Sequence, residues 1–207
     1  MYQIEESDVD RFIRLLKDQR TKTHWEDYWQ NMYDQMHLTE FKIQKWWANK
    51  IDLIGKKVAI LNSGIGFYSV PMCYEKGAFS VNTYDMCPVT SEIAWEANHA
   101  YDNYDHSTLD VVFDNHIFEY RNADVYINTS CEHSYQMKDI IPSGVEVVLS
   151  GNGLTKRGHI NKINTVGELV KQSGIDEVIF TDEMIFSYED ELGTREYKQF
   201  LVYGKKQ

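Results

Sequence analysis

The sequence has few of the residues that mark disulfide-bonded, zinc-bound or repetitive chains. Its 207 residues include only 3 cysteines, 3 prolines and 12 glycines. The cysteines form no Cys-x-x-Cys pair and are odd in number, which excludes a disulfide framework and a structural zinc ribbon. The low glycine and proline counts exclude collagen-like and low-complexity chains. The cysteine pattern fits a reducing compartment.

Long hydrophobic runs and an excess of positive charge are also missing. No window of about 18 apolar residues occurs, so we expect no membrane span. The first residues are acidic and lack the basic-then-apolar order of a signal peptide. The 21 basic residues against 32 acidic ones give a net charge of −11, which disfavours a protein that grips nucleic-acid backbone. We therefore expect a cytoplasmic protein that acts on a small molecule, with neither nucleic acid nor membrane as partner.

The sequence does have ample material for a packed core. Hydrophobic residues make up 43% of the chain and aromatic residues 14%, which excludes intrinsic disorder. Residues 1–54 hold four of the five tryptophans and show helical periodicity. Ile43, Trp47 and Ile51, for example, share one face of a helix that we expect to stop at Gly55. We expect three helices in this N-terminal extension.

The tryptophans of the extension admit two interpretations. Trp25, Trp29 and Trp47 could pack the helices onto the rest of the protein, which is the usual fate of large apolar side chains. They could instead cover the substrate pocket and stack on a flat or cationic acceptor. Packing is the interpretation that base rates favour.

Residues 55–207 alternate short apolar runs with helical stretches and form the expected α/β domain. The run Val58–Leu61 is fully apolar, as is typical of a buried parallel strand. Further strands are expected at 79–84, 110–113, 124–128 and 145–149, and helices at 67–76, 89–100, 132–139 and 165–172. Two long β-rich runs, 177–188 and 196–203, predict a terminal hairpin with an antiparallel last strand. This alternation predicts a mostly parallel sheet between two helical layers, a three-layer αβα architecture.

A glycine-containing turn directly after the first expected strand is the strongest functional signal. Gly64 and Gly66 let the backbone turn sharply and approach a nucleotide-like ligand. Asp85 ends the next strand about 20 residues later, where a carboxylate can accept hydrogen bonds from ribose hydroxyls. Ser69 stands where a dinucleotide motif has its third glycine, which favours an adenosyl ligand without phosphates. The alternative is a simple tight turn, with Asp85 capping a helix.

With these motifs in this order, the sequence resembles the class I S-adenosylmethionine-dependent methyltransferases over about residues 55–204. The segment Asp124–His133 also looks like the fourth-strand motif of that family. The resemblance implies a Rossmann-like sheet of seven strands, S-adenosyl-L-methionine as cofactor, and methyl transfer to a small-molecule or metabolite-like acceptor. The cofactor-binding residues that it implies are Asn62, Ser63, Gly64, Gly66, Asp85, Met86, Asp114, Asn115 and Asn128.

One departure from the family pattern keeps another function open. Asn62 and Ser63 replace the acidic residue that usually precedes the first glycine and meets the methionine ammonium. A non-catalytic binding or assembly protein that retains the fold is therefore the main alternative, and a nicotinamide-dependent oxidoreductase is a third. A narrower resemblance, in residues 127–133, 151–152 and 159–161, is to short methyltransferase-like proteins of tailed bacteriophages and some bacteria.

Polar residues after the fourth and fifth strands are the candidates for acceptor chemistry, because ligands of open α/β sheets lie beyond the carboxyl ends of the strands. His133 has the pKa range of a general base, and Glu132 could orient it or the substrate. The alternative is that both residues cap a short helix. The residues expected to bind substrate are Ser130, Asn152 and His159.

No metal site is expected near these residues. Cys131, Glu132 and His133 are consecutive, and consecutive positions rarely converge on one ion without distant ligands. Cys131 carries no sign of an activated thiol, so a buried small side chain is the expected role.

Overall fold

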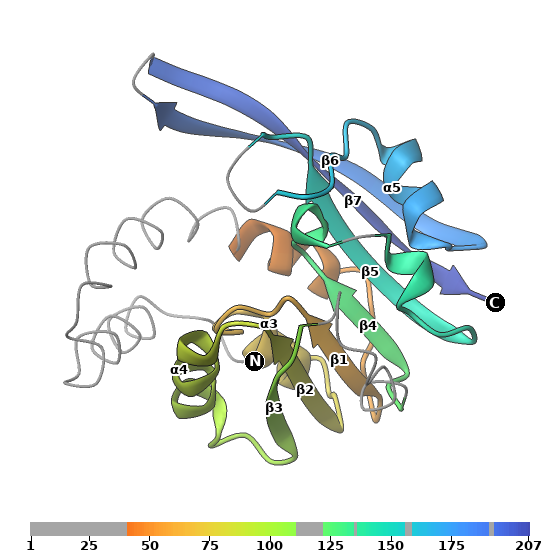
Figure 1. Ribbon diagram of the computed structural model, residues 1–207. Coiled ribbons are helices and arrows are strands. Elements are labelled where there is room, and N and C mark those ends of the chain that lie inside the picture. Colours follow the sequence, from red (N-terminus) through yellow and green to blue (C-terminus); the bar gives the residue numbers. More distant parts are fainter. Residues whose placement is uncertain (1–40, 111–121, 135, 156–158, 191–192) are drawn as a thin grey trace.

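The computed structural model describes residues 41–110, 122–134, 136–155, 159–190 and 193–207 (Figure 1). Some of the residues for which the sequence makes predictions lie outside this part of the chain. These are Trp25, Trp29, the first two expected helices, Asp114 and Asn115. In the described part, no helix is both long enough and apolar enough to cross a bilayer.

Seven strands of the described chain form one sheet in the order β3-β2-β1-β4-β5-β7-β6. Their bounds are β1 Lys57–Leu61, β2 Ser80–Asp85, β3 Tyr104–Thr108, β4 Val125–Asn128, β5 Val145–Asn152, β6 Glu177–Asp190 and β7 Gly193–Lys206. Neighbours pair in parallel from β3 to β5, whereas β7 runs antiparallel to both β5 and β6. The predicted seven-stranded sheet and terminal hairpin are confirmed. The far end of the hairpin projects beyond the other strands (Figure 1).

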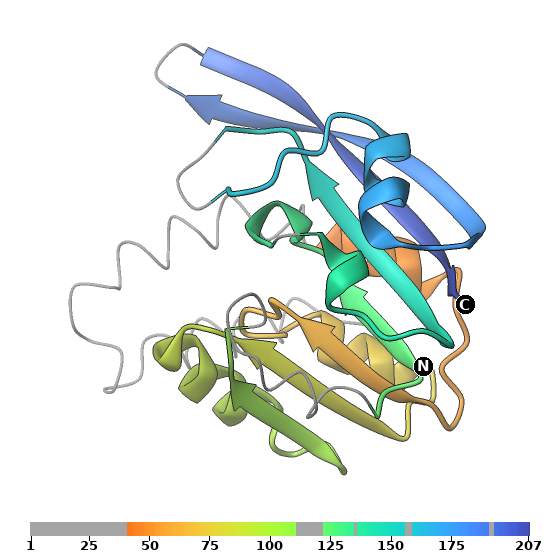
Figure 2. The ribbon, with the colours of Figure 1, turned by 45° about the vertical axis from the view of Figure 1, so that its right-hand side comes forward.

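Helices cover both faces of this sheet (Figures 1 and 2). They are residues 41–48, α3 Ser69–Glu75, α4 Pro88–Asn98, α5 Val166–Ser173, and the short 3-10 helices η2 Cys131–His133 and η3 Met137–Asp139. Alternate strand residues point to opposite faces. Val58 therefore joins a core with Trp47 of the N-terminal helix, and Ala59 joins a second core with Leu169 of α5. The three-layer αβα architecture is confirmed.

The strand after α4 was not predicted from the sequence. It is β3, Tyr104–Thr108. Of the strand expected at residues 110–113, Asp110 has no regular secondary structure and the other three residues lie outside the described part of the chain. β3 lies at the edge of the sheet, and its side chains are mostly half-buried or exposed. An edge strand of this kind needs no continuous apolar run, so a search for such runs passes over it.

The last helix of the N-terminal extension ends earlier than expected. It ends at residue 48 and is followed by a turn, so Gly55 is not its cap. Gly55 has a φ of 70° in a separate turn that leads into β1. Ile43, Trp47 and Ile51 are nonetheless buried as predicted, and the fully buried Trp47 confirms the packing interpretation for that residue.

The helix expected over residues 132–139 was also wrong in form, because the chain makes the two separate 3-10 turns η2 and η3. α5, in contrast, begins one residue later than predicted and has a clear cap at each end. The Oγ1 atom of Thr165 accepts a hydrogen bond from the N–H of Glu168 at 3.1 Å, and Gly174 ends the helix with a φ of 68°. Both are common helix-terminating devices.

Candidate functional site

Two groups of polar residues lie along one edge of the sheet, at the carboxyl ends of the parallel strands. We call residues 62–66 and 84–87 the glycine region, since they follow β1 and end β2. We call residues 128–134, 150–154 and 159–163 the histidine region, since they follow β4 and β5. Ligands of open α/β sheets bind at this edge.

The turn of the glycine region is fastened to the end of β2. The N–H of Ser63 donates to the carbonyl of Tyr84 at 3.0 Å, and the N–H of Gly64 donates to Oδ2 of Asp85 at 2.9 Å. Gly66 has a φ of 67°, and a Cβ atom there would lie 2.9 Å from a methyl group of Val70. A residue with a side chain is therefore strongly disfavoured at position 66.

Gly64 also has a left-handed conformation, with a φ of 53°, but its surroundings differ. A Cβ atom at Gly64 would meet no atom of the described chain within 4 Å. The two glycines thus have separate roles. Gly66 permits close packing against α3, whereas Gly64 borders open space.

The carboxylate of Asp85 lies against this turn and does not point away from it. The residue is half-buried, and Oδ1 accepts a hydrogen bond from the N–H of Cys87 at 2.9 Å. Cys87 is the N-cap residue of α4, and the helix has no side-chain cap hydrogen bond, so Asp85 does not serve as the cap that the alternative interpretation expected. A carboxylate has about four acceptor positions, so the bonds from Gly64 and Cys87 leave capacity for ribose hydroxyls. The neighbouring Met86 is 66% exposed.

Two of the asparagines expected to bind cofactor, Asn62 and Asn128, interact with Ser134. Asn62, which has a φ of 50°, donates a hydrogen bond from Nδ2 to Oγ of Ser134. Asn128 is fully buried and also donates to this hydroxyl, at 3.3 Å. The Oδ1 atom of Asn128 accepts from the N–H of Ser130 at 2.9 Å. Asn128 therefore shapes the turn after β4, and Ser134 links this turn to the end of β1.

Glu132 is the buried acid of the histidine region, and only 7% of its surface is exposed. Its Oε1 atom accepts a hydrogen bond from Nδ2 of Asn152 at 2.8 Å. The same Nδ2 atom donates to Oε1 of Gln199 at 3.0 Å, and Nε2 of Gln199 donates to Oγ of Ser150 at 2.6 Å. The carboxylate is therefore held by β5 and β7 and not by the end of η2, where it was expected if it served as a cap.

Two histidines lie next to this carboxylate. The rings of His133 and His159 pack edge-to-face, with centroids 4.7 Å apart. The chain near His159 is tied to η2, because the N–H groups of Ile160 and Asn161 both donate to the carbonyl of Glu132, at 2.9 and 3.1 Å. The structure thus brings together Glu132, His133 and His159, which the sequence proposed for separate catalytic and substrate-binding roles.

Cys131 is not placed as a nucleophile. The side chain is buried, and burial raises the pKa of its thiol well above the ordinary value of 9.0. A thiol that stays protonated is a poor nucleophile. The three cysteines of the chain are all free, as expected from their number and spacing.

Several residues of the site were not found from the sequence. Gln44 of the N-terminal helix donates a hydrogen bond to Oγ1 of Thr129, after β4, at 3.1 Å. His106 of β3 is joined to Oγ1 of Thr83 through its Nδ1 atom at 2.7 Å. Burial lowers the pKa of His106, while the nearby carboxylates of Asp85 and Asp105 act in the opposite direction. No local motif marks these contacts, because they join elements far apart in the chain.

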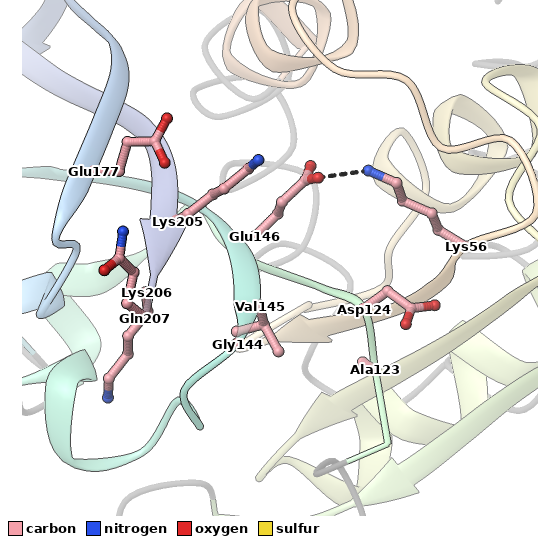
Figure 3. Close-up of a pocket in the computed structure, with 10 residues that line it drawn as sticks. All are labelled: Lys56, Ala123, Asp124, Gly144, Val145, Glu146, Glu177, Lys205, Lys206 and Gln207. Carbon is pink, nitrogen blue, oxygen red and sulfur yellow. Dashed lines mark hydrogen bonds and ion pairs between the residues drawn. The ribbon is translucent and has the colours of Figure 1, made fainter.

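A hollow of about 470 Å³ lies at the opposite edge of the sheet (Figure 3). It is lined by residues at the amino ends of β1, β4, β5 and β6 and by the last residues of β7. The Nζ atom of Lys56 and Oε1 of Glu146 form an ion pair across it at 2.7 Å. Because ligands of such sheets bind at the carboxyl ends, this hollow is separate from the candidate site.

Comparisons with known proteins define the fold further. Neither the protein-family profiles nor the curated protein sequences gave a match. Among solved structures, the chain is similar to magnesium protoporphyrin IX methyltransferase from Synechocystis with bound SAH. The two share 15% identity and a TM-score of 0.59 over 98% of this chain and 95% of that one.

Two further structures agree with this result. N-methyltransferase NodS from Bradyrhizobium japonicum matches with 8% identity and a TM-score of 0.57, over 82% of this chain and 97% of its own. A protein from Pyrococcus horikoshii described as an RNA methyltransferase matches with 13% identity and a TM-score of 0.54, over 80% and 82%. The chain therefore has the fold of S-adenosylmethionine-dependent methyltransferases.

Proposed function

We propose that this protein binds S-adenosyl-L-methionine in the glycine region and transfers its methyl group to a small-molecule acceptor in the histidine region. The observation that carries the proposal is the position of the Asp85 carboxylate. It lies at the carboxyl end of β2 and accepts a hydrogen bond from the turn that contains Gly64, in a chain whose fold is similar to that of solved methyltransferases.

The residues present fit an adenosyl ligand. Asp85 retains acceptor capacity for the two hydroxyls of a ribose, and the space beside Gly64 is not filled by any atom of the described chain. Met86 is exposed next to Asp85 and could contact the adenine. The Oδ1 atom of Asn62 is a neutral acceptor for the methionine ammonium, in place of the carboxylate that the family usually has.

The cofactor would supply an activated methyl group, and the chain would supply position. Methyl transfer is an in-line displacement, so holding the two reactants at the correct distance and angle accounts for much of the catalysis. Glu132 is fixed by Asn152 and could orient an acceptor. His133, which is exposed, could take up the proton that an acceptor hydroxyl or amine loses. Ser130 is half-buried beside them and could contact the acceptor.

A small acceptor is favoured by the charge of the protein. The net charge of −11 repels nucleic-acid backbone. The similar structures include methyltransferases of a porphyrin and of RNA by name, so the fold alone does not select the acceptor. Three free cysteines support the expectation that the protein works in the cytoplasm.

Isothermal titration of the full-length protein with S-adenosylhomocysteine tests the cofactor site directly. We expect one binding site per chain, and we expect Asp85→Ala to lower the affinity by about 100-fold or more. A hydrogen bond to a charged group contributes about 1.5–3 kcal/mol, and the carboxylate would receive two from the ribose. Asp102→Ala is the matched control, because Asp102 is an exposed acid in the turn before β3.

Three outcomes would overturn the proposal. Unchanged affinity in Asp85→Ala, with an unchanged melting curve, would remove the assigned role of this carboxylate. Absence of binding by the folded wild-type protein would favour the non-catalytic alternative. Binding of NADH in place of S-adenosylhomocysteine would favour an oxidoreductase.

A further inference from the structure

The histidine region contains three side chains whose donor atoms converge. One carboxylate oxygen of Glu132 and one ring nitrogen each of His133 and His159 all lie within 4.8 Å of one another. Metal–ligand bonds of about 2.0–2.2 Å place bound donor atoms about 3–4 Å apart. The donor atoms would have to move closer together by about 1 Å to bind one ion. Because His133 is exposed, its side chain can rotate to make this approach. The sequence argument against a metal site was the lack of a distant ligand, and His159 is such a ligand.

The carboxylate of Glu132 is already held by a second layer of hydrogen bonds. Asn152 donates to its Oε1 atom at 2.8 Å, and Gln199 and Ser150 extend this buried chain. Ligating carboxylates in metal sites are held in this way, which fixes their direction and tunes their affinity. The arrangement restrains a buried acid that would otherwise be costly to keep charged.

The protonation of His159 is set by its other neighbour. Its Nδ1 atom lies 2.8 Å from the carbonyl oxygen of Leu154. A carbonyl can only accept, so Nδ1 carries the proton and the lone pair of the neutral ring lies on Nε2. Histidine ligands in metal sites usually donate their second N–H to a backbone carbonyl or a carboxylate in this manner.

Gly151 of β5 allows the backbone segments that carry these three side chains to pack closely. A Cβ atom on Gly151 would lie 2.3 Å from Ile163 and 3.2 Å from Cβ of Cys131. Glycine at position 151 therefore lets η2 pack directly on β5. The two N–H bonds from Ile160 and Asn161 to the carbonyl of Glu132 then fix the chain that carries His159. The three donors are thus positioned by tertiary contacts.

We propose that Glu132, His133 and His159 form a binding site for a divalent transition-metal ion. Two imidazoles and one carboxylate suit Zn²⁺, Mn²⁺ or Fe²⁺ and do not suit Mg²⁺, which prefers oxygen ligands. Three protein ligands leave coordination positions open for a substrate atom. In a role that rests on the proposed methyl transfer, these positions would bind an oxygen of the acceptor and lower the pKa of its hydroxyl, which would then lose its proton to water and not to His133.

Isothermal titration of the metal-free full-length protein with ZnCl₂, without any adenosyl ligand, tests the site. We expect these residues to bind one Zn²⁺ per chain. Mn²⁺ should bind more weakly than Zn²⁺, as in the usual affinity order of divalent metals, and Mg²⁺ should bind more weakly than either. His159→Ala and His133→Ala should each lower the Zn²⁺ affinity by more than about 100-fold, beyond the effect of losing a neighbouring hydrogen bond. His99→Ala is the matched control, because His99 is an exposed histidine on α4 whose Nδ1 faces carbonyls of its own helix.

A second readout uses CoCl₂, whose visible absorption reports coordination by protein nitrogen and oxygen atoms. The spectrum of the wild-type complex should be lost in His159→Ala and retained in His99→Ala. Equal Zn²⁺ affinities in all three histidine variants, or no Zn²⁺ binding by the wild type, would overturn the proposal. Titration with S-adenosylhomocysteine separates this failure from that of the proposed function, since Asp85 and the metal ligands lie in different regions.

Discussion

The glycine and histidine regions lie on the same edge of one sheet but are held together in different ways. The glycine region is fixed by backbone N–H groups, such as those of Gly64 and Cys87, which both donate to the carboxylate of Asp85. The histidine region is fixed by side chains that come from four places in the chain, and its central bonds join Glu132 to Asn152 and Asn152 to Gln199. The first arrangement leaves a motif in the sequence, and the second does not.

Because the two regions are held differently, substitutions in them should destabilise the protein for different reasons. Substitutions in the glycine region should act mainly through backbone strain, because two of its glycines have positive φ. Substitutions in the histidine region should act through buried polar groups that lose their partners. The following experiments measure that contrast.

The largest effect on stability is expected for Gly66→Ala. The left-handed conformation costs a residue with a side chain about 1–2 kcal/mol, and the contact of 2.9 Å with the stiff side chain of Val70 adds overpacking of about 1 kcal/mol or more. We expect a loss of about 2–4 kcal/mol in the free energy of unfolding, measured with urea. Gly64→Ala is the control and should lose only the conformational part. Equal losses for both variants would show that the contact with Val70 has no energetic role.

The next effect is expected for Asn152→Ala in the histidine region. This change removes the Nδ2 group that donates to Glu132 and Gln199, so both buried acceptors lose this hydrogen bond. We expect the free energy of unfolding to fall by about 1–3 kcal/mol. The same variant should bind Zn²⁺ about 10–100-fold more weakly. Asn164→Ala is the comparison, since Asn164 makes an exposed bond to Glu168 and should change stability by less than about 0.5 kcal/mol. A similar small loss for Asn152→Ala would contradict the role of this chain of bonds.

The smallest effect concerns His106, beside the glycine region. Burial lowers its pKa below the ordinary value of 6.5, so the unfolded chain takes up a proton near that pH before the folded chain does. The folded protein should therefore lose stability as the pH falls from about 6.5 toward the lower, folded pKa, and keep this contribution above pH 6.5.

Urea unfolding of the wild type and His106→Gln at several pH values between 7.5 and 5 checks this. The free energy of unfolding of the wild type relative to the variant should fall as the pH is lowered through this range. A constant difference would show that His106 titrates alike in both states. His99→Gln, at an exposed position, gives the reference behaviour of a histidine outside the core.

Most of the fold could be predicted because it depends on local patterns. Apolar runs located β1, β4 and β5, since buried strands need continuous apolar side chains. The two hairpin strands were located by their long β-rich runs, although β6 is mostly exposed. The edge strand β3 was not found, because it has no continuous apolar run. A single helix was expected at residues 132–139, but the chain forms the two short helices η2 and η3. The packing of η2 against Gly151 is a tertiary contact that local sequence patterns do not reveal.

For the candidate site, the sequence pointed to individual polar residues but not to the residues that they contact. Glu132, His133, Asn152 and His159 were all selected as polar residues near strand ends, but nothing in their spacing showed that three of them converge. Gln199 was not selected at all. It lies opposite Asn152 in the antiparallel pairing of β5 and β7, and the register between two such distant strands is not visible in either one.

The sequence by itself determined the strand and helix rhythm, the antiparallel end of the sheet and the glycine turn with its acidic partner. The rhythm and the turn depend on steric and hydrophobic preferences that act locally, and Asp85 could be found because it ends the next strand at the expected spacing. Only the tertiary structure decided that a buried acid, two imidazoles and an amide network meet after β4 and β5. Their contacts form when separate strands pair and a loop folds back, because hydrogen bonds and metal ligands require proximity in space and not in sequence.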